Sequence, residues 1–522
     1  MNTKALRQKI LDLAIRGKLV PQDPNDEPAE VLLERIRKQK QQMLKEGKLK
    51  KKDIKNDTII FKGEDNLHYE KFQDGTVKCI EDEIPFELPE GWEWARLGNL
   101  FSTITGNTPS TKDVSLYGDE YPFYKPTDLD AGFDVCFSED TVSEKGYKNG
   151  RILPVYSVLV TCIGATIGKT GYIRNSGICN QQINAILPNT FILPEYTYFC
   201  MCSAFEQRQI WTNSSATTLP ILNKSKFDSL FFPVPPKAQQ TRTVEKIKEL
   251  LHFVEIIQQE KRTLQETIKL TKSKIRDLAI RGKLVPQDPN DEPASVLLER
   301  IRAEKEELIK QGKIKRDKKE SVIFRGDDNS YYLRTGRVEE SLEDWRFDDL
   351  PETWKICCLG ELCDYGDCIN VNTEDIAEDA WILDLEDIEK DTGTVLKKVT
   401  KDQRNSVSTK HKFHSGQVLY SKLRPYLNKV VLSDADGYCT SEILPLEFKN
   451  CVLPEYARYY LMSGTFITYA NHCSYGVKMP RLGTTDGKKA IFSLPPLSEQ
   501  KRIVETIDFC FMQLNKISEA LA

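Results

Sequence analysis

Residues 12–37 read DLAIRGKLVPQDPNDEPAEVLLERIR, and residues 277–302 repeat this stretch with one change, Ser295 in place of Glu30. A second similarity joins stretches that lie 260 residues apart, namely 191–196 with 451–456 and 235–247 with 495–507. A period of this length is far too long for a solenoid. The sequence therefore predicts a tandem duplication, in which two copies of a domain and its helices are related by an internal pseudo-two-fold.

Apolar residues after Pro236 follow the alternating three- and four-residue steps of a coiled-coil seam. They are Ile247, Leu250, Val254, Ile257, Leu264, Ile268, Ile275 and Leu278, with Lys261 and Thr271 interrupting the stripe. The pattern predicts one helix over residues 237–281, which ends at Gly282 because glycine readily takes the left-handed conformation of a helix cap. After the proline-rich loop 285–293, we expect a shorter helix that ends near residue 311 and is capped by Gly312.

The matching terminal helix is divided between the two ends of the chain. Its first half is 498–521, with seam residues Ile503, Ile507, Cys510, Leu514, Ile517 and Leu521, and its second half carries Leu6, Ile10 and Leu13. Because these pieces match successive parts of the central helix, we expect the chain ends to meet and to pair with that helix, which gives a circular organisation. An alternative stays open, in which each helix packs only on its own domain.

Two segments between the helices are rich in short β-like runs, glycine, aromatic residues and turn signals. Both begin alike, with LPEGW at 88–92 and LPETW at 350–354, and both end in a double proline. The expected fold class is α+β, with two α/β domains separated by long antiparallel coiled-coil helices. The predicted parts are an N-terminal helical spacer half (1–52), a first domain (53–235), a central helical spacer (236–318), a second domain (319–495) and a C-terminal spacer helix (496–522).

The frames of the two domains match, whereas their loops differ. Strand 158–161 aligns with 418–421, and the loops that follow are CIGATIGK at 162–169 and KLRPYLNK at 422–429. Further on, CNQQI at 179–183 aligns with CTSEI at 439–443. These side chains suit DNA, because Asn and Gln pair with adenine, Arg and Lys with guanine, Glu accepts from cytosine, and Lys also contacts phosphate. Each of them is equally typical of a solvated loop on an edge strand, and that alternative stays open.

The composition excludes several classes of protein. The 522 residues carry 74 Lys+Arg against 78 Asp+Glu, so a nucleic-acid-binding surface must be local. No apolar run of about 18 residues would span a membrane, and the N-terminus lacks the apolar core of a signal peptide, so we expect a cytoplasmic location. The 14 cysteines lack paired CxxC spacing with histidine partners, so we expect neither a metal site nor a disulfide framework.

Motifs for catalysis are also lacking. Residues 164–170 (GATIGKT) are similar to a phosphate-binding loop, but that motif requires glycine at position 163, where isoleucine stands. His411 and His414 lack a carboxylate or cysteine array, and we interpret them as a pair of loop residues. The chain also contains no G-x-S-x-G or H-E-x-x-H motif. We therefore expect no catalytic residue and no cofactor on this chain.

Together, these stretches resemble a known family over essentially the full length of the chain: the specificity (S) subunits of type I restriction–modification systems. The similarity lies in PPLSEQKRIV at 495–504 with its relative at 235–244, in LAIRGKLVPQD at 13–23 and 278–288, and in KLRPYLNK at 422–429. TPST at 108–111 and YPFYKPTDL at 121–129 are similar to the first part of many target-recognition domains.

The resemblance implies a non-catalytic subunit that reads an asymmetric, bipartite DNA site, with one target-recognition domain for each half. It also implies two methyltransferase (M) subunits, which carry S-adenosylmethionine, and up to two restriction (R) subunits, which use ATP and Mg. The candidate DNA contacts are Lys422, Arg424, Asn428, Lys429, Ser441 and Glu442 in the second domain and Lys125, Thr161, Lys169, Asn180, Gln181 and Gln182 in the first.

Three other interpretations stay open. The chain could be the specificity subunit of a fused restriction–methylation enzyme of another type, which the neighbouring reading frame would reveal. It could be a coiled-coil adaptor without a DNA role, which loss of DNA binding in the presence of its partner would favour. An enzyme would need a nucleotide site, and we expect neither ATP nor S-adenosylmethionine to bind the isolated chain.

Overall fold

The computed structural model describes residues 2–521 apart from 48, 50, 52–53, 216–218, 314–319, 329, 343–349 and 405–406. It divides into two compact units, Met1–Lys261 (unit 1) and Arg262–Ala522 (unit 2). The division falls inside the long helix α8 (Lys237–Ala279). Each unit therefore combines one of the two mixed domains with part of the central helix. Within the described residues, no helix combines the length and apolar character that a membrane span requires.

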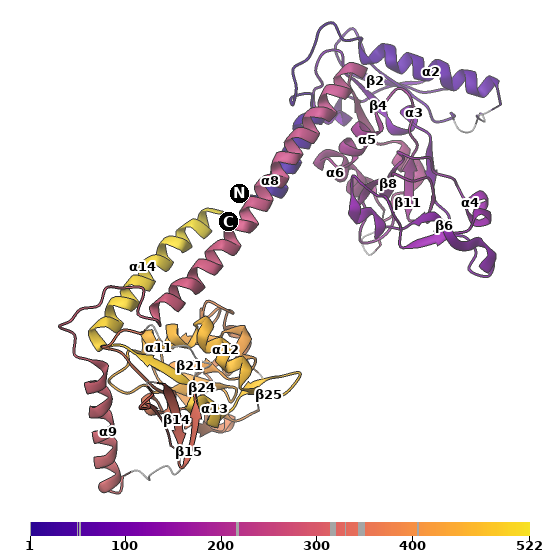
Figure 1. Cartoon of the computed structure of the whole chain (residues 1–522). Helices are drawn as coiled ribbons and strands as arrows, with labels where there is room; N and C mark the ends of the chain where they lie inside the picture. Colours follow the sequence, from indigo (N-terminus) through magenta and orange to yellow (C-terminus); the bar gives the residue numbers. More distant parts are fainter. Residues whose placement is uncertain are drawn as a thin grey trace. The chain divides into compact units, whose positions relative to one another are not determined.

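Unit 1 mixes short helices with small sheets (Figure 1). Its helices are α1 (Thr3–Ile15), α2 (Ala29–Lys45), α3 (Leu97–Leu100), α4 (Glu144–Asn149), α5 (Pro194–Met201), α6 (Ala204–Asn213), α7 (Lys224–Asp228) and the first part of α8. Its strands are β1 (Ile59–Lys62), β2 (His68–Lys71), β3 (Val77–Cys79), β4 (Glu93–Arg96), β5 (Thr103–Thr105), β6 (Tyr117–Tyr124), β7 (Asp140–Val142), β8 (Val158–Thr161), β9 (Thr170–Tyr172), β10 (Ile178–Cys179), β11 (Ile183–Ile186) and β12 (Phe231–Val234). The central sheet has the order β5-β11-β8-β9, and all its pairs are antiparallel.

Unit 2 repeats this frame. Its helices are the rest of α8, α9 (Ala294–Lys310), α10 (Leu359–Leu362), α11 (Pro454–Leu461), α12 (Gly464–His472), α13 (Thr484–Lys489) and α14 (Leu497–Leu521). Its strands are β13 (Ser321–Arg325), β14 (Tyr331–Thr335), β15 (Val338–Ser341), β16 (Lys355–Cys358), β17 (Ile369–Val371), β18 (Trp381–Leu383), β19 (Val399–Thr400), β20 (Lys410–Phe413), β21 (Val418–Ser421), β22 (Val430–Leu432), β23 (Gly437–Thr440), β24 (Ile443–Leu446), β25 (Ser474–Tyr475), β26 (Arg481–Leu482) and β27 (Ile491–Leu494). The sheet β22-β21-β24 corresponds to β9-β8-β11. A further five-stranded sheet has the order β17-β20-β23-β18-β19, and its strand β23 lies between β22 and β24 in the chain. The mixed helix and strand content agrees with the predicted α+β class.

The repeated stretch packs in the same way in both units. Gly17 and Gly282 have φ angles of +65° and +66°. A side chain on either glycine would overlap the proline of the matching Leu-Pro-Glu motif, which is Pro89 in unit 1 and Pro351 in unit 2. Both the left-handed backbone and the close approach require glycine. The stretch therefore holds the first part of each domain, and Gly282 has the conformation predicted for it.

In unit 1, the N-terminal helix α1 covers part of α8. The Nη2 atom of Arg7 lies 3.5 Å from Oε1 of Glu255. Ile10 belongs to the same buried cluster as Ile247 and Val254. Burial of these aliphatic side chains stabilises the pair by roughly 1.5–3 kcal/mol for each fully buried residue.

In unit 2, the C-terminal helix α14 lies along the remaining part of α8 (Figure 1). Lys272 Nζ donates to Asn515 Oδ1 at 2.5 Å, and the guanidinium of Arg276 lies 5.7 Å from the ring centre of Phe511. Because the partner number falls as the α8 number rises, the two helices run antiparallel.

The predicted seam on α8 is buried in part. Ile268 and the unit 1 residues Ile247 and Val254 are buried, whereas Ile257 and Leu264 are 38% and 39% exposed. Among the described residues, these two side chains of the middle stretch are therefore not buried within their own units. A continuous coiled coil and the circular closure of the chain ends therefore stay predictions.

Candidate nucleic-acid interface

In unit 2, three segments come together beside the buried strand β21: the loop that follows it, the turn between β23 and β24, and the hairpin of β25 and β26. Lys422 N donates to Glu442 O at 3.0 Å and so joins the loop to the turn. Arg424 N donates to Pro480 O at 2.7 Å and joins the loop to the hairpin. The predicted loop and turn are thus neighbours, and the hairpin lies next to them. We call the loop, the turn and the hairpin together the three-segment surface.

Unit 1 contains the same arrangement at the matching positions. Cys162 N donates to Gln182 O at 2.7 Å, and Gly164 N donates to Pro220 O at 3.0 Å. The third segment was missing from the sequence prediction in both units. A signal for it does exist, because the Pro-x-Leu runs at 220–222 and 480–482 also lie 260 residues apart.

One predicted DNA contact of the second domain, the carboxylate of Glu442, is engaged within the protein. Arg481 on β26 makes an ion pair with Glu442, with Nη2 at 2.7 Å from Oε1 and Nε at 3.1 Å from both carboxylate oxygens. The hydrogen bonds to Glu442 raise the pKa of Arg481. Glu442 therefore has its charge compensated within the protein. The hairpin adds the exposed side chains Tyr475, Val477, Lys478 and Met479 to the surface.

Two cations on this surface lack an acidic partner. Lys422 and Arg424 are both partly exposed, and among the described residues neither forms an ion pair. The Arg424 Nε has no hydrogen-bond partner within the same residues. Ser441 is exposed next to them. Lys422, Arg424 and Ser441 are thus the polar side chains that this part of the loop and turn brings to the surface.

Asn428 and Lys429 have contacts inside the domain. Asn428 is 5% exposed and its Nδ2 donates to Met462 O at 3.4 Å. Lys429 Nζ donates to Leu385 O at 2.6 Å, and burial lowers the pKa of this lysine. Asn428 thus supports the loop from within and does not belong to its outer surface.

In unit 1, two predicted contacts are also buried. Thr161 is fully buried at the end of β8, and Asn180 is 7% exposed. The Nδ2 atom of Asn180 donates to Oε1 of Gln182 at 2.9 Å, which holds that side chain. Gln181 is exposed and accepts a hydrogen bond from the Thr108 hydroxyl. Gln181 and Gln182 are therefore the members of this turn that reach the surface.

The two predicted lysines of unit 1 form ion pairs within the protein. Lys125 pairs with Asp140. Lys169 Nζ lies 2.7 Å from Asp130 Oδ1. Since exposed ion pairs contribute roughly 0–1 kcal/mol, a phosphate group can compete for both lysines.

The backbone of the loop distinguishes the two units. Arg424 and Asn428 both have φ of +50°, and the matching residues of unit 1 are Gly164 and Gly168, with φ of +103° and +86°. The loop therefore needs left-handed backbone at two places. Glycine adopts it freely, Asn tolerates it, and Arg does so at a cost of about 1–2 kcal/mol. Arg424 therefore stands, at that cost, where the matching loop of unit 1 has glycine.

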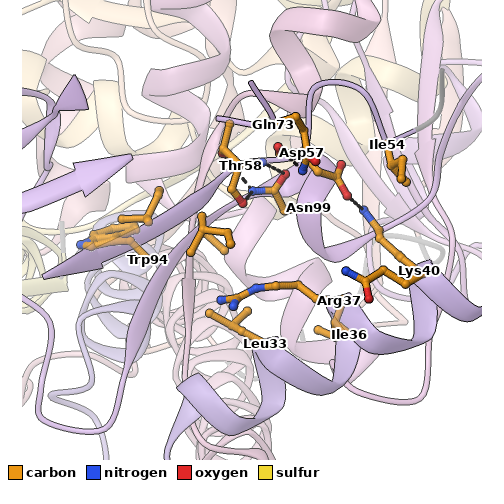
Figure 2. A pocket seen from close by; sticks show the side chains of 14 residues that line it. Leu33, Ile36, Arg37, Lys40, Ile54, Asp57, Thr58, Gln73, Trp94 and Asn99 are labelled. Atoms are coloured by element: carbon orange, nitrogen blue, oxygen red, sulfur yellow. Dashed lines mark hydrogen bonds and ion pairs between the residues drawn. The ribbon is translucent and has the colours of Figure 1, made fainter. Parts of the chain in front are cut away.

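A pocket of about 210 Å³ in unit 1 involves different elements (Figure 2). It lies between α2 and the residues around β1 and β4. Lys40 Nζ donates to Asp57 Oδ2 and to Gly98 O, both at 2.8 Å, and Asn99 Nδ2 donates to Thr58 O at 2.8 Å. Its main polar groups satisfy one another, and none of its lining residues belongs to the three-segment surface.

The histidine prediction was wrong for one residue. His411 lies on strand β20 and is buried, with Nδ1 at 2.8 Å from Ile443 O, because the run ends in the core residue Phe413. Burial lowers the pKa of His411. His414 follows the strand, is exposed, and has Nε2 at 2.8 Å from Glu447 Oε2. In the part of the chain that the structure describes, no group of three or more His, Cys, Asp or Glu residues could hold a metal ion.

Comparison with known proteins identifies the family. A family model, the type I restriction modification DNA specificity domain, matches residues 89–266 and again residues 351–520. The chain belongs to this family. Specificity subunits of type I systems are non-catalytic, determine DNA target recognition, and act with methyltransferase and restriction subunits.

Relatives support the assignment to the specificity-subunit family along the whole chain. The EcoAI specificity subunit of Escherichia coli is 27% identical and its match covers 98% of this chain and 90% of that protein. The EcoEI specificity subunit of Escherichia coli is 26% identical over 99% of this chain and 90% of that protein. A solved chain from work on the assembly and conformational transition of a type I system is 16% identical, with a TM-score of 0.54 over 84% of this chain and 94% of that one. This last similarity supports the fold.

Proposed function

We propose that each unit presents one DNA-reading surface and that the two surfaces together read a bipartite, asymmetric site. The observation that supports this most directly is the pair of matched loops, with one backbone and different side chains. Lys422, Arg424 and Ser441 are the leading contacts in unit 2, and Gln181 and Gln182 with Lys125 and Lys169 are those in unit 1. Because the side chains differ, the two half-sites differ.

The internal repeat supports the proposed assembly. Two copies of nearly the same stretch, 12–37 and 277–302, offer two equivalent surfaces, so the chain binds two M subunits and the complex adds up to two R subunits. S-adenosylmethionine belongs to M and ATP with Mg to R, and this chain carries no cofactor. The helices α1, α8 and α14 act as the antiparallel spacer between the surfaces, and the complex works in the cytoplasm.

Methylome sequencing of cells that carry this chain with its M subunit tests the proposal. We expect one bipartite motif with unlike halves separated by a fixed spacer. In the Arg424→Ala chain, we expect relaxed preference at a position of one half only, with a loss of about 1–3 kcal/mol for that base. A single continuous motif, or equal relaxation of both halves, would refute the proposal. Uniform weakening on every sequence would instead assign Arg424 to a phosphate.

A further inference from the structure

A second feature of unit 2 is a cavity of about 610 Å³ between α8, α11, α14 and the loop around residues 389–394. Its lining is polar and carries several cations, and it is distinct from the three-segment surface. A cavity of this volume falls within the range of small-molecule sites.

Arg276 of α8 is the most buried cation of the cavity. It is 5% exposed, and its Nη1 donates to Asp391 O at 3.4 Å. Its Nε has no hydrogen-bond partner among the described residues. Burial lowers the pKa of Arg276. The charges of Asp391 and Asp277 offset part of this effect, but neither makes an ion pair with Arg276 among the described residues. A guanidinium with five donors is thus removed from water with one long hydrogen bond, which is costly unless a further acceptor is present.

Two other cations line the same cavity. Arg458 of α11 donates from Nη2 to Thr392 O at 3.1 Å, and its Nε also lacks a partner within the described residues. Lys272 donates to Asn515 at 2.5 Å, and burial together with the charge of Arg276 lowers its pKa. The three positive charges therefore repel one another in a partly desolvated place.

The acidic residues of the lining are occupied elsewhere. Asp391 is paired with Lys269 at 2.8 Å, Asp508 accepts from the Tyr459 hydroxyl, and Glu389 accepts from the Thr392 hydroxyl at 2.7 Å. Lys516 and Glu519 line the cavity too, but both are exposed. None of these carboxylates makes an ion pair with Arg276, Arg458 or Lys272 among the described residues.

The scaffold itself does not require the two arginines, whereas the position of Lys272 carries a cation in both units, Arg7 in unit 1. In the repeat, the position of Arg276 is held in unit 1 by Leu11, and that of Arg458 by Tyr198. Both unit 1 residues lie in or against the buried apolar cluster, where Tyr198 packs against Phe133 and Phe199. The two arginine positions are thus held by Leu11 and Tyr198 in unit 1, where the cations Arg174 and Lys248 lie over the ring of Phe133, and by guanidinium groups in unit 2.

We propose that this cavity of unit 2 binds a phosphate group, with Arg276, Arg458 and Lys272 as its donors. The forked guanidinium matches two phosphate oxygens, and the ammonium adds a point charge. The occupant is a small molecule, since the near-complete burial of Arg276 leaves no access for a duplex backbone. Free inorganic phosphate and a small phosphate monoester both satisfy this chemistry.

Calorimetric titration of the full chain, in chloride buffer at fixed ionic strength, tests the site. One arm uses inorganic phosphate and the other glycerol phosphate, and the arm with the tighter binding distinguishes the two sources. We expect saturable binding at one site. Arg276→Leu, which installs the unit 1 residue, should weaken binding by about tenfold or more, because it removes a charge-assisted hydrogen bond. Arg262→Leu removes an exposed arginine from the same helix and should leave binding unchanged.

Thermal unfolding keeps the test decisive if calorimetric heats are small. Phosphate should raise the melting temperature of the full chain and of Arg262→Leu, but not that of Arg276→Leu. Arg458→Gln, which keeps a donor and the packing, should lose most of the same stabilisation. The proposal is overturned if neither phosphate ligand binds saturably, or if Arg276→Leu and Arg458→Gln bind as the unmodified chain does.

Discussion

The loops at 162–169 and 422–429 follow equivalent strands and make equivalent backbone hydrogen bonds, yet they carry different side chains at the two left-handed positions. Unit 1 has glycine at both, and unit 2 has Arg424 and Asn428. The backbone of the loop is therefore a property of the shared scaffold. The side chains are an addition, and their cost is highest where arginine takes the place of glycine.

The second of these positions, Gly168 in unit 1 and Asn428 in unit 2, is held by different hydrogen bonds in the two units. In unit 1, Gln207 Nε2 donates to Gly168 O and to Met201 O, both at 2.8 Å. In unit 2, Asn428 itself donates to Met462 O. In unit 1, a side chain from helix α6 holds the loop, whereas in unit 2 a side chain of the loop itself makes the contact.

The largest effect is expected for Gly168→Ala. A methyl group there would overlap the Gln207 amide, and moving that amide breaks two hydrogen bonds, so we expect a loss of about 2–3 kcal/mol in the free energy of unfolding. Urea unfolding measures it. Gly416→Ala is the matched control, because Gly416 has φ of +89° with no atom near the added methyl group. Equal losses in the two variants would contradict a role for Gln207.

The next effect separates stability from recognition at Arg424. Arg424→Gly should leave stability unchanged or raise it by up to about 1 kcal/mol, since glycine relieves the left-handed strain but loses entropy on folding. The same change should weaken binding of the complex to one half-site by about 1–3 kcal/mol. Unfolding curves and fluorescence anisotropy with duplexes altered in one half, at constant salt, measure the two quantities.

Arg337→Gly, at an exposed turn of unit 2, is the charge-matched control for that experiment and should leave half-site preference unchanged. A loss of both stability and binding in Arg424→Gly would show that the arginine supports the fold.

The smallest effect is a response to pH at a position where the two units carry different residues. Burial, together with the nearby charge of Glu30, raises the pKa of Glu93 on β4 to about 6, and the matching position of unit 2 is Lys355. Because the folded state holds this proton more tightly than the unfolded state, stability is lost as pH rises from about 4.5 to about 6. Glu93→Gln should add about 1 kcal/mol at pH 7.5, and the gain should vanish below pH 4.5. Melting temperatures across that range measure it, and a gain that is constant with pH would contradict the assignment.

The sequence predicted the framework well because the framework obeys simple patterns. The apolar steps after Pro236 gave a helix over 237–281, and α8 covers Lys237–Ala279. The aligned stretches 158–161 and 418–421 are both buried strands. Repeats, helical periodicity and glycine caps are local signals, and packing did not override them.

The surface was harder to predict. Thr161 ends a strand whose four residues are all buried, so the alternation that would separate inner from outer side chains is lost. The ion pair of Arg481 with Glu442 joins residues 39 positions apart, and no local sequence pattern predicts it. Exposed hairpin residues such as Val477 follow no period either. Contacts that depend on the meeting of distant loops need the folded structure.

The fit of Gly17 and Gly282 against a proline has a consequence for modularity. Each glycine touches the part of its domain that is the same in both copies, and not the loops that differ. The repeated stretch thus provides one packing site that accepts any domain beginning with the matching Leu-Pro-Glu motif. The recognition loops of one domain can then change during evolution while the packing between the domain and the repeated stretch stays the same.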